Sequence, residues 1–246
     1  MAAVRYLRNA PITEALIDLR VKARRDANEA AFGAALEDLP GFPILERQHQ
    51  TELTFAGGTG VAPTQTARER FAGWFVRSPD RLSLAQFRVD GFTFNRLKPY
   101  TSWGDIFPKA MDLWRLYLEV ARPEMVTRLA VRYINHIPLP EGEYDLVNFL
   151  AAVPPIPEPL PQYVSGFVSH VVIHDPPSGM SGAIRQVFEQ STNGSAMRLL
   201  LDNDVYINGQ FEPSNPEIAV KLDSLREFKN RIFFNVLTDR LLERFE

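Results

Sequence analysis

The clearest structural pattern in the sequence is Thr13-Glu14-Ala15-Leu16-Ile17-Asp18-Leu19-Arg20-Val21-Lys22. Apolar residues occupy every second position from 15 to 21, while most residues on the alternate positions are charged. A period of two is typical of a β-strand in a sheet with one buried face, because successive side chains point to opposite faces. The stretch therefore predicts a sheet whose second face is charged. That face meets solvent, a partner or a ligand.

A second segment, 127–138, repeats this design. Its apolar residues alternate with polar positions that hold Arg128, Arg132 and His136. Two segments far apart in the sequence therefore predict the same kind of strand, each with one charged side.

Length and composition indicate a globular chain. With 246 residues, 45% of them hydrophobic, it can bury a sizeable core, as one large α+β domain or two small coupled ones. The net charge of −3 does not suggest a nucleic-acid surface, so nucleic acid is an unexpected partner. The absence of cysteine excludes disulfides and thiolate metal sites. No apolar run approaches the roughly 20 residues that span a bilayer, and 1–8 lacks the apolar core of a secretion signal. We expect a cytoplasmic protein without membrane contact.

Turn and cap residues predict further elements. Asp90-Gly91 and Asn193-Gly194 each favour a hairpin with a type I′ turn. Ser102 and Asp105 resemble a capping box ahead of a helix that Pro123 ends.

The region before the first of these hairpins is less regular. It predicts a helix over 31–39, capped by Asp26 or Asn28 and stopped by Pro40-Gly41, and then short strands at 51–56 and 74–76. The glycine cluster at 57–60 lacks the spacing of a phosphate-binding loop, and we interpret it as a hairpin or loop.

A proline-rich connection, 153–163, divides the chain. It contains Pro154-Pro155-Ile156-Pro157-Glu158-Pro159-Leu160-Pro161, which lacks the backbone donors of a helix or an interior strand. A stiff spacer is favoured over a proline ligand for SH3-type partners. Residues 1–152 then form an N-terminal α+β half, and 164–246 form a β-meander followed by a long helix. We expect the halves to make one continuous unit.

The closing helix is predicted from its cap, Asn215, and from Pro216 at its first position, and it runs without a breaker to Glu246. Phe228, Phe233 and Phe234 broaden its apolar stripe. Packing on a sheet and homodimerisation through this helix both remain open. The predicted fold is α+β, with antiparallel twisted sheets, packed helices and a long C-terminal helix.

Several motifs together resemble a known family. They are Asn9-Ala10-Pro11-Ile12-Thr13-Glu14-Ala15, Arg128-Leu129-Ala130-Val131-Arg132-Tyr133-Ile134-Asn135, Leu201-Asp202-Asn203-Asp204, and the closing helix with Phe234 and Thr238. This pattern resembles a sporadically distributed family of uncharacterised bacterial proteins with an N-P-P-I-x-E start and an R-x-x-L-R-Y-I-N strand. The likeness covers essentially the whole chain, with Ala10 in place of the first proline and Ala130-Val131 where glycine or leucine is expected. It implies a bacterial source and a shared fold. It implies no reaction and supplies no catalytic residue.

Familiar catalytic motifs are absent from the sequence. It has no HExxH, no GxSxG elbow and no thiol nucleophile. His170 and His174, four apart in a predicted strand, would lie roughly 13 Å from each other. They cannot share one zinc ion without a bend in the strand.

Two groups of residues remain as candidate sites. Asp202 and Asp204 share one side of a predicted strand about 6–7 Å apart, so they are candidate Mg²⁺ ligands. The second group would suit a phosphate-bearing ligand if it converged on one sheet face: Glu14, Asp18, Arg20, Arg132 and His136, with Lys22, Arg88, Arg96 and Arg185 as further members. The favoured alternative is an ordinary solvated face with cross-strand ion pairs.

These observations lead to two functional interpretations. The first is a non-catalytic binding or interaction protein of the bacterial cytoplasm, with an unidentified protein partner and no cofactor. The second is a phosphate-ligand or nucleotide-handling enzyme that uses Arg20, Arg132, Asp202 and Asp204. Mg²⁺ is expected only under the second interpretation.

Overall fold

The structure, a computed structural model, describes residues 7–24, 29–58, 61–140, 145–190 and 197–246. Its strands form one antiparallel nine-stranded sheet in the order β2-β3-β4-β5-β1-β6-β9-β8-β7. The strands are β1 (Ile12–Lys22), β2 (Ile44–Gly58), β3 (Val61–Arg77), β4 (Ser83–Arg88), β5 (Gly91–Leu97), β6 (Met125–Leu139), β7 (Gly166–Asp175), β8 (Met180–Gln190) and β9 (Met197–Phe211). The helices are α1 (Glu29–Leu36), α2 (Trp103–Ala121), α3 (Glu217–Val236) and α4 (Asp239–Leu242), with 3-10 turns η1 (Leu146–Asn148) and η2 (Glu243–Phe245). The predicted α+β class is confirmed, with the strands joined in a single sheet.

Strands β1 and β6 lie side by side in the middle of the sheet. Ile17 of β1 is opposite Val131 of β6, and both side chains are fully buried. Asp18, the next residue of β1, points to the other face. The two-sided pattern of the segments 13–22 and 127–138 is therefore confirmed, and the two segments pair with each other.

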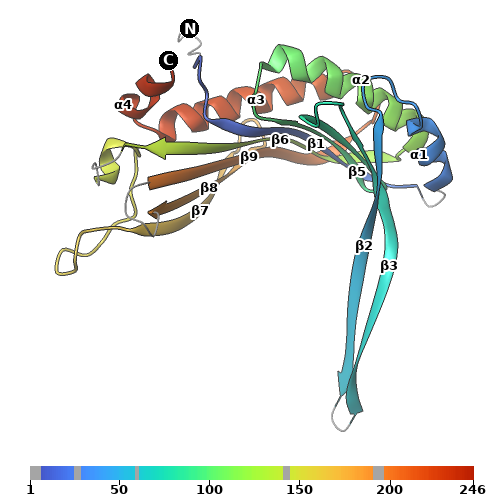
Figure 1. Ribbon diagram of the computed structural model, residues 1–246, viewed down its shortest axis with the longest axis horizontal. Coiled ribbons are helices and arrows are strands. Elements are labelled where there is room, and N and C mark those ends of the chain that lie inside the picture. The colour runs from blue at the N-terminus through green and yellow to red at the C-terminus, as the bar shows by residue number, and fades with distance from the viewer. Residues whose placement is uncertain (1–6, 25–28, 59–60, 141–144, 191–196) are drawn as a thin grey trace.

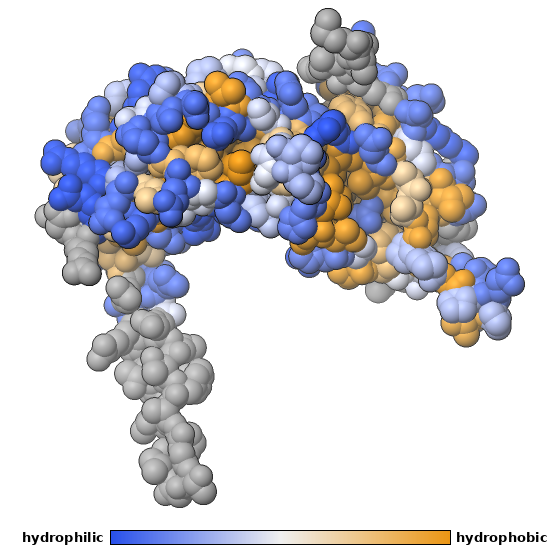
Figure 2. Space-filling view, turned by 180° about the vertical axis from the view of Figure 1, so that it is seen from behind, coloured by the Kyte–Doolittle hydropathy of each residue, from blue (hydrophilic) through white to orange (hydrophobic). Residues whose placement is uncertain are grey.

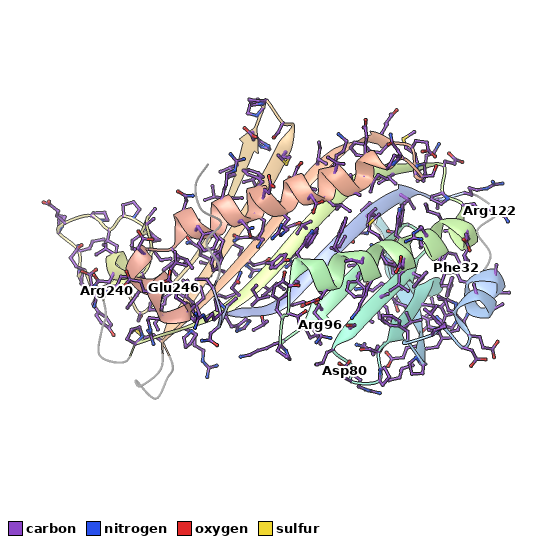
Figure 3. The ribbon with its side chains drawn as sticks, turned by 90° about the horizontal axis from the view of Figure 1, so that it is seen from above. Phe32, Asp80, Arg96, Arg122, Arg240 and Glu246 are labelled. Carbon is purple, nitrogen blue, oxygen red and sulfur yellow. The ribbon has the colours of Figure 1, made fainter. Side chains whose placement is uncertain are left out.

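Helices α2 and α3 lie side by side over one face of the sheet (Figures 1 and 3). Helix α3 packs on β6, β8 and β9, whereas α2 packs on β4 and β5, and α1 on β3. Trp103 Nε1 donates a hydrogen bond to Asp223 Oδ1 at 2.7 Å, which connects the start of α2 to α3. The largest fully buried side chains of the core include Tyr117, Tyr133, Phe32, Phe87, Phe92 and Phe94. The helices therefore cover the apolar face and leave the charged face open.

Helix α2 begins as the predicted capping box requires. Ser102 Oγ accepts a hydrogen bond from Asp105 N at 3.1 Å and donates one to Asp105 Oδ2 at 2.8 Å. After Ala121 the chain leaves the helix through Arg122, whose φ of 43° is left-handed. Both ends of this helix therefore agree with the sequence-based expectation.

The hairpin predicted at Asp90-Gly91 is present between β4 and β5, but its turn differs. Arg88 pairs with Gly91, so the loop consists of Val89 and Asp90, and neither has the positive φ of a type I′ turn. Gly91 is part of β5, where an added Cβ would lie 2.5 Å from the backbone oxygen of Leu19. The close approach of β1 explains this glycine. The other predicted hairpin, at 193–194, lies outside the described residues.

The C-terminal helical region differs from the predicted unbroken helix to Glu246. Helix α3 ends at Val236, and the backbone of Leu237 is extended. Thr238 Oγ1 donates a hydrogen bond to the backbone oxygen of Asn148 at 2.6 Å. This tertiary contact holds the chain at the break, before α4 begins. The prediction of one continuous helix to the end of the sequence is wrong.

Strands of both predicted halves belong to the same sheet. Strand β6, from 1–152, pairs with β9, from 164–246, along most of its length. The division into two halves stays a prediction. No helix among the described residues is long and apolar enough to cross a membrane.

Strands β2 and β3 continue beyond the sheet as a long two-stranded arm, on the side away from the helices (Figure 1). They are 15 and 17 residues long, far longer than the predicted short strands. Strand β3 pairs with β4 only from Gly73 to Arg77. At Gly73 the pairing with β2 shifts register between Gln48 and His49, which is typical of a β-bulge that bends a strand pair. Gly73 has a φ of +153°, and a Cβ there would lie 2.4 Å from the backbone oxygen of Phe87.

Replacement of Gly73 by alanine is expected to destabilise the fold by about 2–4 kcal/mol, because the new Cβ combines a strained φ with a backbone overlap. Chemical denaturation of both proteins measures the difference. The control is Gly104→Ala in α2, where the closest atom to an added Cβ is Ser102 Oγ at 3.6 Å. An equal loss of stability in both variants would contradict the assignment of Gly73 to the bend.

Candidate functional site

The sheet face opposite the helices carries polar and charged residues of six neighbouring strands, β4, β5, β1, β6, β9 and β8, and we call it the polar face. Directly opposite residues of paired strands point to the same face. The register therefore places these residues together: Asp18 opposite Thr93, Arg20 opposite Arg128, Arg132 opposite Asp204, and Arg185 opposite Asp202. The predicted convergence on one face is thus present for Asp18, Arg20, Arg132, Asp202 and Asp204.

Asp18 is the most heavily bonded group of the polar face. Its Oδ1 accepts hydrogen bonds from Thr93 Oγ1 at 2.6 Å and Arg88 Nη2 at 3.0 Å. Its Oδ2 accepts from Arg128 Nη1 at 3.2 Å and Arg20 Nε at 3.3 Å. Burial acts to raise the pKa of Asp18, but the bond from Thr93 and the charges of Arg88 and Arg20 outweigh burial and lower the pKa below 3.8. The carboxylate is therefore held ionised by its neighbours.

Arg128 connects Asp18 to a second carboxylate. Its Nη2 donates to Asp204 Oδ2 at 2.8 Å, and its guanidinium lies 4.6 Å from the ring centroid of Tyr206. Burial raises the pKa of Asp204, although Arg128 and Arg132 act in the opposite direction. The two aspartates shift in opposite directions because Asp18 has four bonded donors, while the one bond described for Asp204 comes from Arg128.

Arg132 forms a bidentate pair with Asp202. Its Nε and Nη2 donate to the two carboxylate oxygens at 2.8 and 2.6 Å, the geometry of the strongest arginine–carboxylate pairs. The hydrogen bond to Asp202 raises the pKa of Arg132 against the effect of burial, and the charges of Asp204 and Glu14 add to the increase. The guanidinium fork of Arg132, which a phosphate ligand would use, already has a partner.

The remaining predicted residues lie around this network. Glu14 Oε1 accepts a hydrogen bond from Asn95 Nδ2 at 2.6 Å. His136 is exposed and stands four residues beyond Arg132 on β6, about 13 Å away along the strand. Lys22 Nζ pairs with a carboxylate oxygen of Glu124 at 2.5 Å. Arg88 belongs to the network, and Arg185 is exposed beside it.

The prediction that Arg96 joins this face is wrong. Arg96 is opposite Ala15, a buried residue of the helix-covered face. Its Nη1 donates to Ser83 Oγ at 3.1 Å and lies 3.8 Å from Asp80 Oδ2. The odd–even offset between β1 and β5 sets this orientation, and the sequence does not reveal it.

The candidate metal ligands Asp202 and Asp204 do share one face, as predicted, but each bonds an arginine. Within the described residues, no group of three or more His, Asp or Glu side chains is placed to hold a metal ion. Mg²⁺ usually needs further oxygen ligands besides two carboxylates. The metal site stays a prediction of the enzyme interpretation.

Two members of the network were missed as site candidates, Arg128 and Thr93. Arg128 lies four residues before Arg132 on the same side of one strand, so the period of two was a usable signal. Thr93 lies between two core phenylalanines, and its role depends on its position opposite Asp18. No local feature of the sequence marks that second role.

The helix-covered face contains a buried lysine that the sequence analysis overlooked. Lys229 of α3 is 7% exposed; its Nζ bonds Asn230 Oδ1 at 2.6 Å and lies 3.7 Å from the ring centroid of Tyr133. Burial, with a smaller contribution from the charge of Arg226, lowers the pKa of Lys229 to about 7. Lys229 falls on the same helical stripe as the buried Leu225, and that spacing was the available signal.

Comparisons with known proteins add no assignment: no protein-family model matches the chain, and no curated protein matches it. The family resemblance indicated by the sequence motifs stays a prediction.

Replacement of Asp18 by asparagine is expected to reduce the free energy of unfolding at pH 7 by about 2–4 kcal/mol, because three arginines lose a shared, largely buried carboxylate. Asp112→Asn is the control, since that exposed carboxylate pairs only with Arg115 among the described residues. This substitution should reduce the free energy of unfolding by less than about 0.5 kcal/mol.

The difference in stability should depend on pH. The folded pKa of Asp18 is lowered, so the contribution of its carboxylate to stability is complete above pH 3.8 and disappears as pH falls through the folded pKa. The difference in free energy of unfolding between wild type and Asp18→Asn should therefore disappear at acid pH. A gap that persists there would contradict the assigned charge pairing.

Replacement of Lys229 by methionine is expected to remove a pH dependence of stability. The folded pKa is about 7 and the ordinary value is 10.5, so between these values the unfolded chain binds more protons, and stability rises with pH. Urea denaturation from pH 7 to about 9.5 should show an increase of about 2–3 kcal/mol in wild type. Lys229→Met should flatten the curve, and Lys221→Met, a less buried lysine of the same helix, should keep it. Equal slopes in all three proteins would refute the burial of an ionisable Lys229.

Proposed function

We propose that this protein is a non-catalytic binding protein of the bacterial cytoplasm, and that its polar face holds a protein partner. The observation that supports this proposal is the internal pairing of charge. Arg20, Arg88 and Arg128 bond Asp18, and Arg132 bonds Asp202 in bidentate geometry. A face with this balance suits a partner of mixed polar surface better than a highly charged ligand.

The order of the network supports the same function. Side chains of a binding surface lose rotamer freedom on association, at a cost of about 0.5–1.5 kcal/mol each. In the polar face the guanidinium of Arg88 is already held by Asp18, Thr93 and Gln86. A partner that packs on these side chains would find them in place, so less of its binding free energy is lost to ordering.

Nucleic acid is a less suitable ligand for this face. Binding to a phosphate backbone draws on lysine and arginine charges that displace counterions. The network arginines instead direct their charge to carboxylates of the sheet. Partner binding should accordingly depend weakly on salt concentration, whereas a nucleic acid would be released steeply as salt increases.

The proposal predicts that a charge reversal on the polar face removes a specific partner. The full chain, immobilised as wild type, as Arg185→Glu and as Arg115→Glu, is used for affinity capture from the native host, with mass spectrometry as the readout. Arg185 is exposed on the polar face, and Arg115 is exposed on α2. A partner of the polar face should be depleted at least about tenfold with Arg185→Glu and retained with Arg115→Glu. Identical capture by all three proteins would count against this surface.

The enzyme interpretation is favoured by one observation, the shared face of Arg20, Arg132, Asp202 and Asp204. Isothermal titration with inorganic phosphate and a nucleoside triphosphate, with and without Mg²⁺, separates the two interpretations. Binding that Arg132→Ala abolishes would support the enzyme, since the ligand must displace Asp202 from its guanidinium. An absence of heat in every titration would leave the binding function as proposed.

A further inference from the structure

The two edge strands of the sheet differ in how they are protected. Strands β2 and β7 stand at its ends. Strand β2 carries Glu46-Arg47-Gln48-His49-Gln50, and charged side chains of this kind discourage an edge from pairing with another chain. Strand β7 reads Gly166-Phe167-Val168-Ser169-His170-Val171-Val172-Ile173-His174-Asp175, without lysine, arginine, glutamate or proline. The acidic residue of β7, Asp175, is the last of the strand, so the rest of β7 lacks the charged residues that discourage edge pairing.

Strand β7 also exposes apolar side chains. Val168, Val171 and Val172 are 68%, 50% and 42% exposed. Val168 and Val172 point to the polar face, opposite Val187 and Ala183 of β8, whereas Val171 points to the other side. Seen from behind, the apolar surface gathers in the half of the molecule away from the arm (Figure 2), and Figure 1 places β7 in that half. Exposed valines on both sides of an edge strand are typical of a strand that acquires a neighbour.

Helix α3, which the sequence predicts as a possible dimer interface, is a less suitable surface for dimerisation than β7. Of the three phenylalanines that broaden its stripe, Phe228 and Phe233 are buried in this chain's own core, and Phe234 is partly buried against it. Among the described residues α3 exposes one valine, Val220, whereas β7 exposes Val168, Val171 and Val172.

We propose that β7 is a dimerisation strand that pairs antiparallel with β7 of a second copy, about a two-fold axis perpendicular to the sheet. Such an axis makes an isologous interface, in which each contact occurs twice. Backbone groups at the free edge of β7 would gain hydrogen-bond partners, as in other cases of strand addition. The sheet would continue from one copy into the other.

An antiparallel register centred on His170 pairs several apolar residues of β7 with each other. With His170 opposite His170 of the second copy, Val168 lies opposite Val172, and Phe167 lies opposite Ile173. An apolar pair thus forms on each face of the new strand pair, and Val171 lies opposite Ser169. A shift of the centre to Val171 would instead place Val168 opposite His174. This apolar match is the argument for a second copy of the chain as the occupant of the edge.

The dimer would bring two polar faces together. An axis perpendicular to the sheet leaves both polar faces on the same side. The two networks around Asp18 would then belong to one continuous surface, with an arm at each far end. The proposed dimer stands on the edge strand alone and does not depend on what the polar face binds.

Charge exchange at two positions tests the strand and its register. Sedimentation velocity measures the mass of the full chain up to about 100 µM, at about pH 8, where imidazole groups are in general neutral. Wild type should be a dimer. Val168→Lys with Val172→Lys places like charges opposite each other and should weaken the dimer by at least about a hundredfold. Val168→Glu with Val172→Lys changes the same positions but places opposite charges together, so it should remain dimeric.

Thermal unfolding of wild type and of both double variants serves as the control, and each protein should show a cooperative transition if it is folded. Hydrogen exchange gives an independent readout, because the β7 amides should be protected at high protein concentration and exchange faster on dilution. A monomeric wild-type chain at the highest concentration would overturn the proposal. Equal dissociation of the like-charge and opposite-charge variants would overturn the register, and with it the argument for a second copy.

Discussion

The structure depends on the antiparallel pairing of β1 and β6, two strands with the same alternation. Ile17 and Val131 lie opposite each other on the buried face. The charged residues that alternate with the apolar ones along each strand must therefore point to the other face. A register slip of one residue would move every buried side chain of a strand to solvent. This constraint separates the sheet into a face that requires helices and a face that carries ions, and both functional proposals arise from the second.

The polar face illustrates how partly buried charge is made tolerable. Desolvation acts against the ionised forms of Asp18 and Asp204 alike. At Asp18 the four donors outweigh desolvation, so the pKa is lowered. At Asp204 the charges of Arg128 and Arg132 do not outweigh desolvation, so the pKa is raised. The result is a connected set of side chains whose positions are set by one another. Charge pairing of this kind contributes order and specificity, and it leaves little unbalanced charge for a phosphate ligand.

The helix-covered face has polar exceptions of its own. Lys229 enters the apolar layer beside Tyr133, close in the register to Asn203, which is opposite Tyr133 and fully buried. No hydrogen-bond partner for the Asn203 side-chain amide is described. Unpaired buried polar groups cost free energy. The buried Asn203 and Lys229 therefore reduce the free energy of unfolding at neutral pH. Lys229 must either keep its charge in an apolar layer or lose its proton, and both cost free energy.

The alternation of β1 and β6, the capping of α2 at Ser102 and the existence of the β4–β5 hairpin are predictable from the sequence, because they follow from side-chain period and local hydrogen bonds. The period of two also places Asp18, Arg132 and Asp202 on strand faces. The choice of neighbouring strands depends on the whole fold. It brings Asp18 to Thr93, turns Arg96 to the other face, and lets Thr238 bond Asn148 where the last helix breaks. Those outcomes depend on contacts between residues distant in the chain, and the period of a single strand carries no information about its partner.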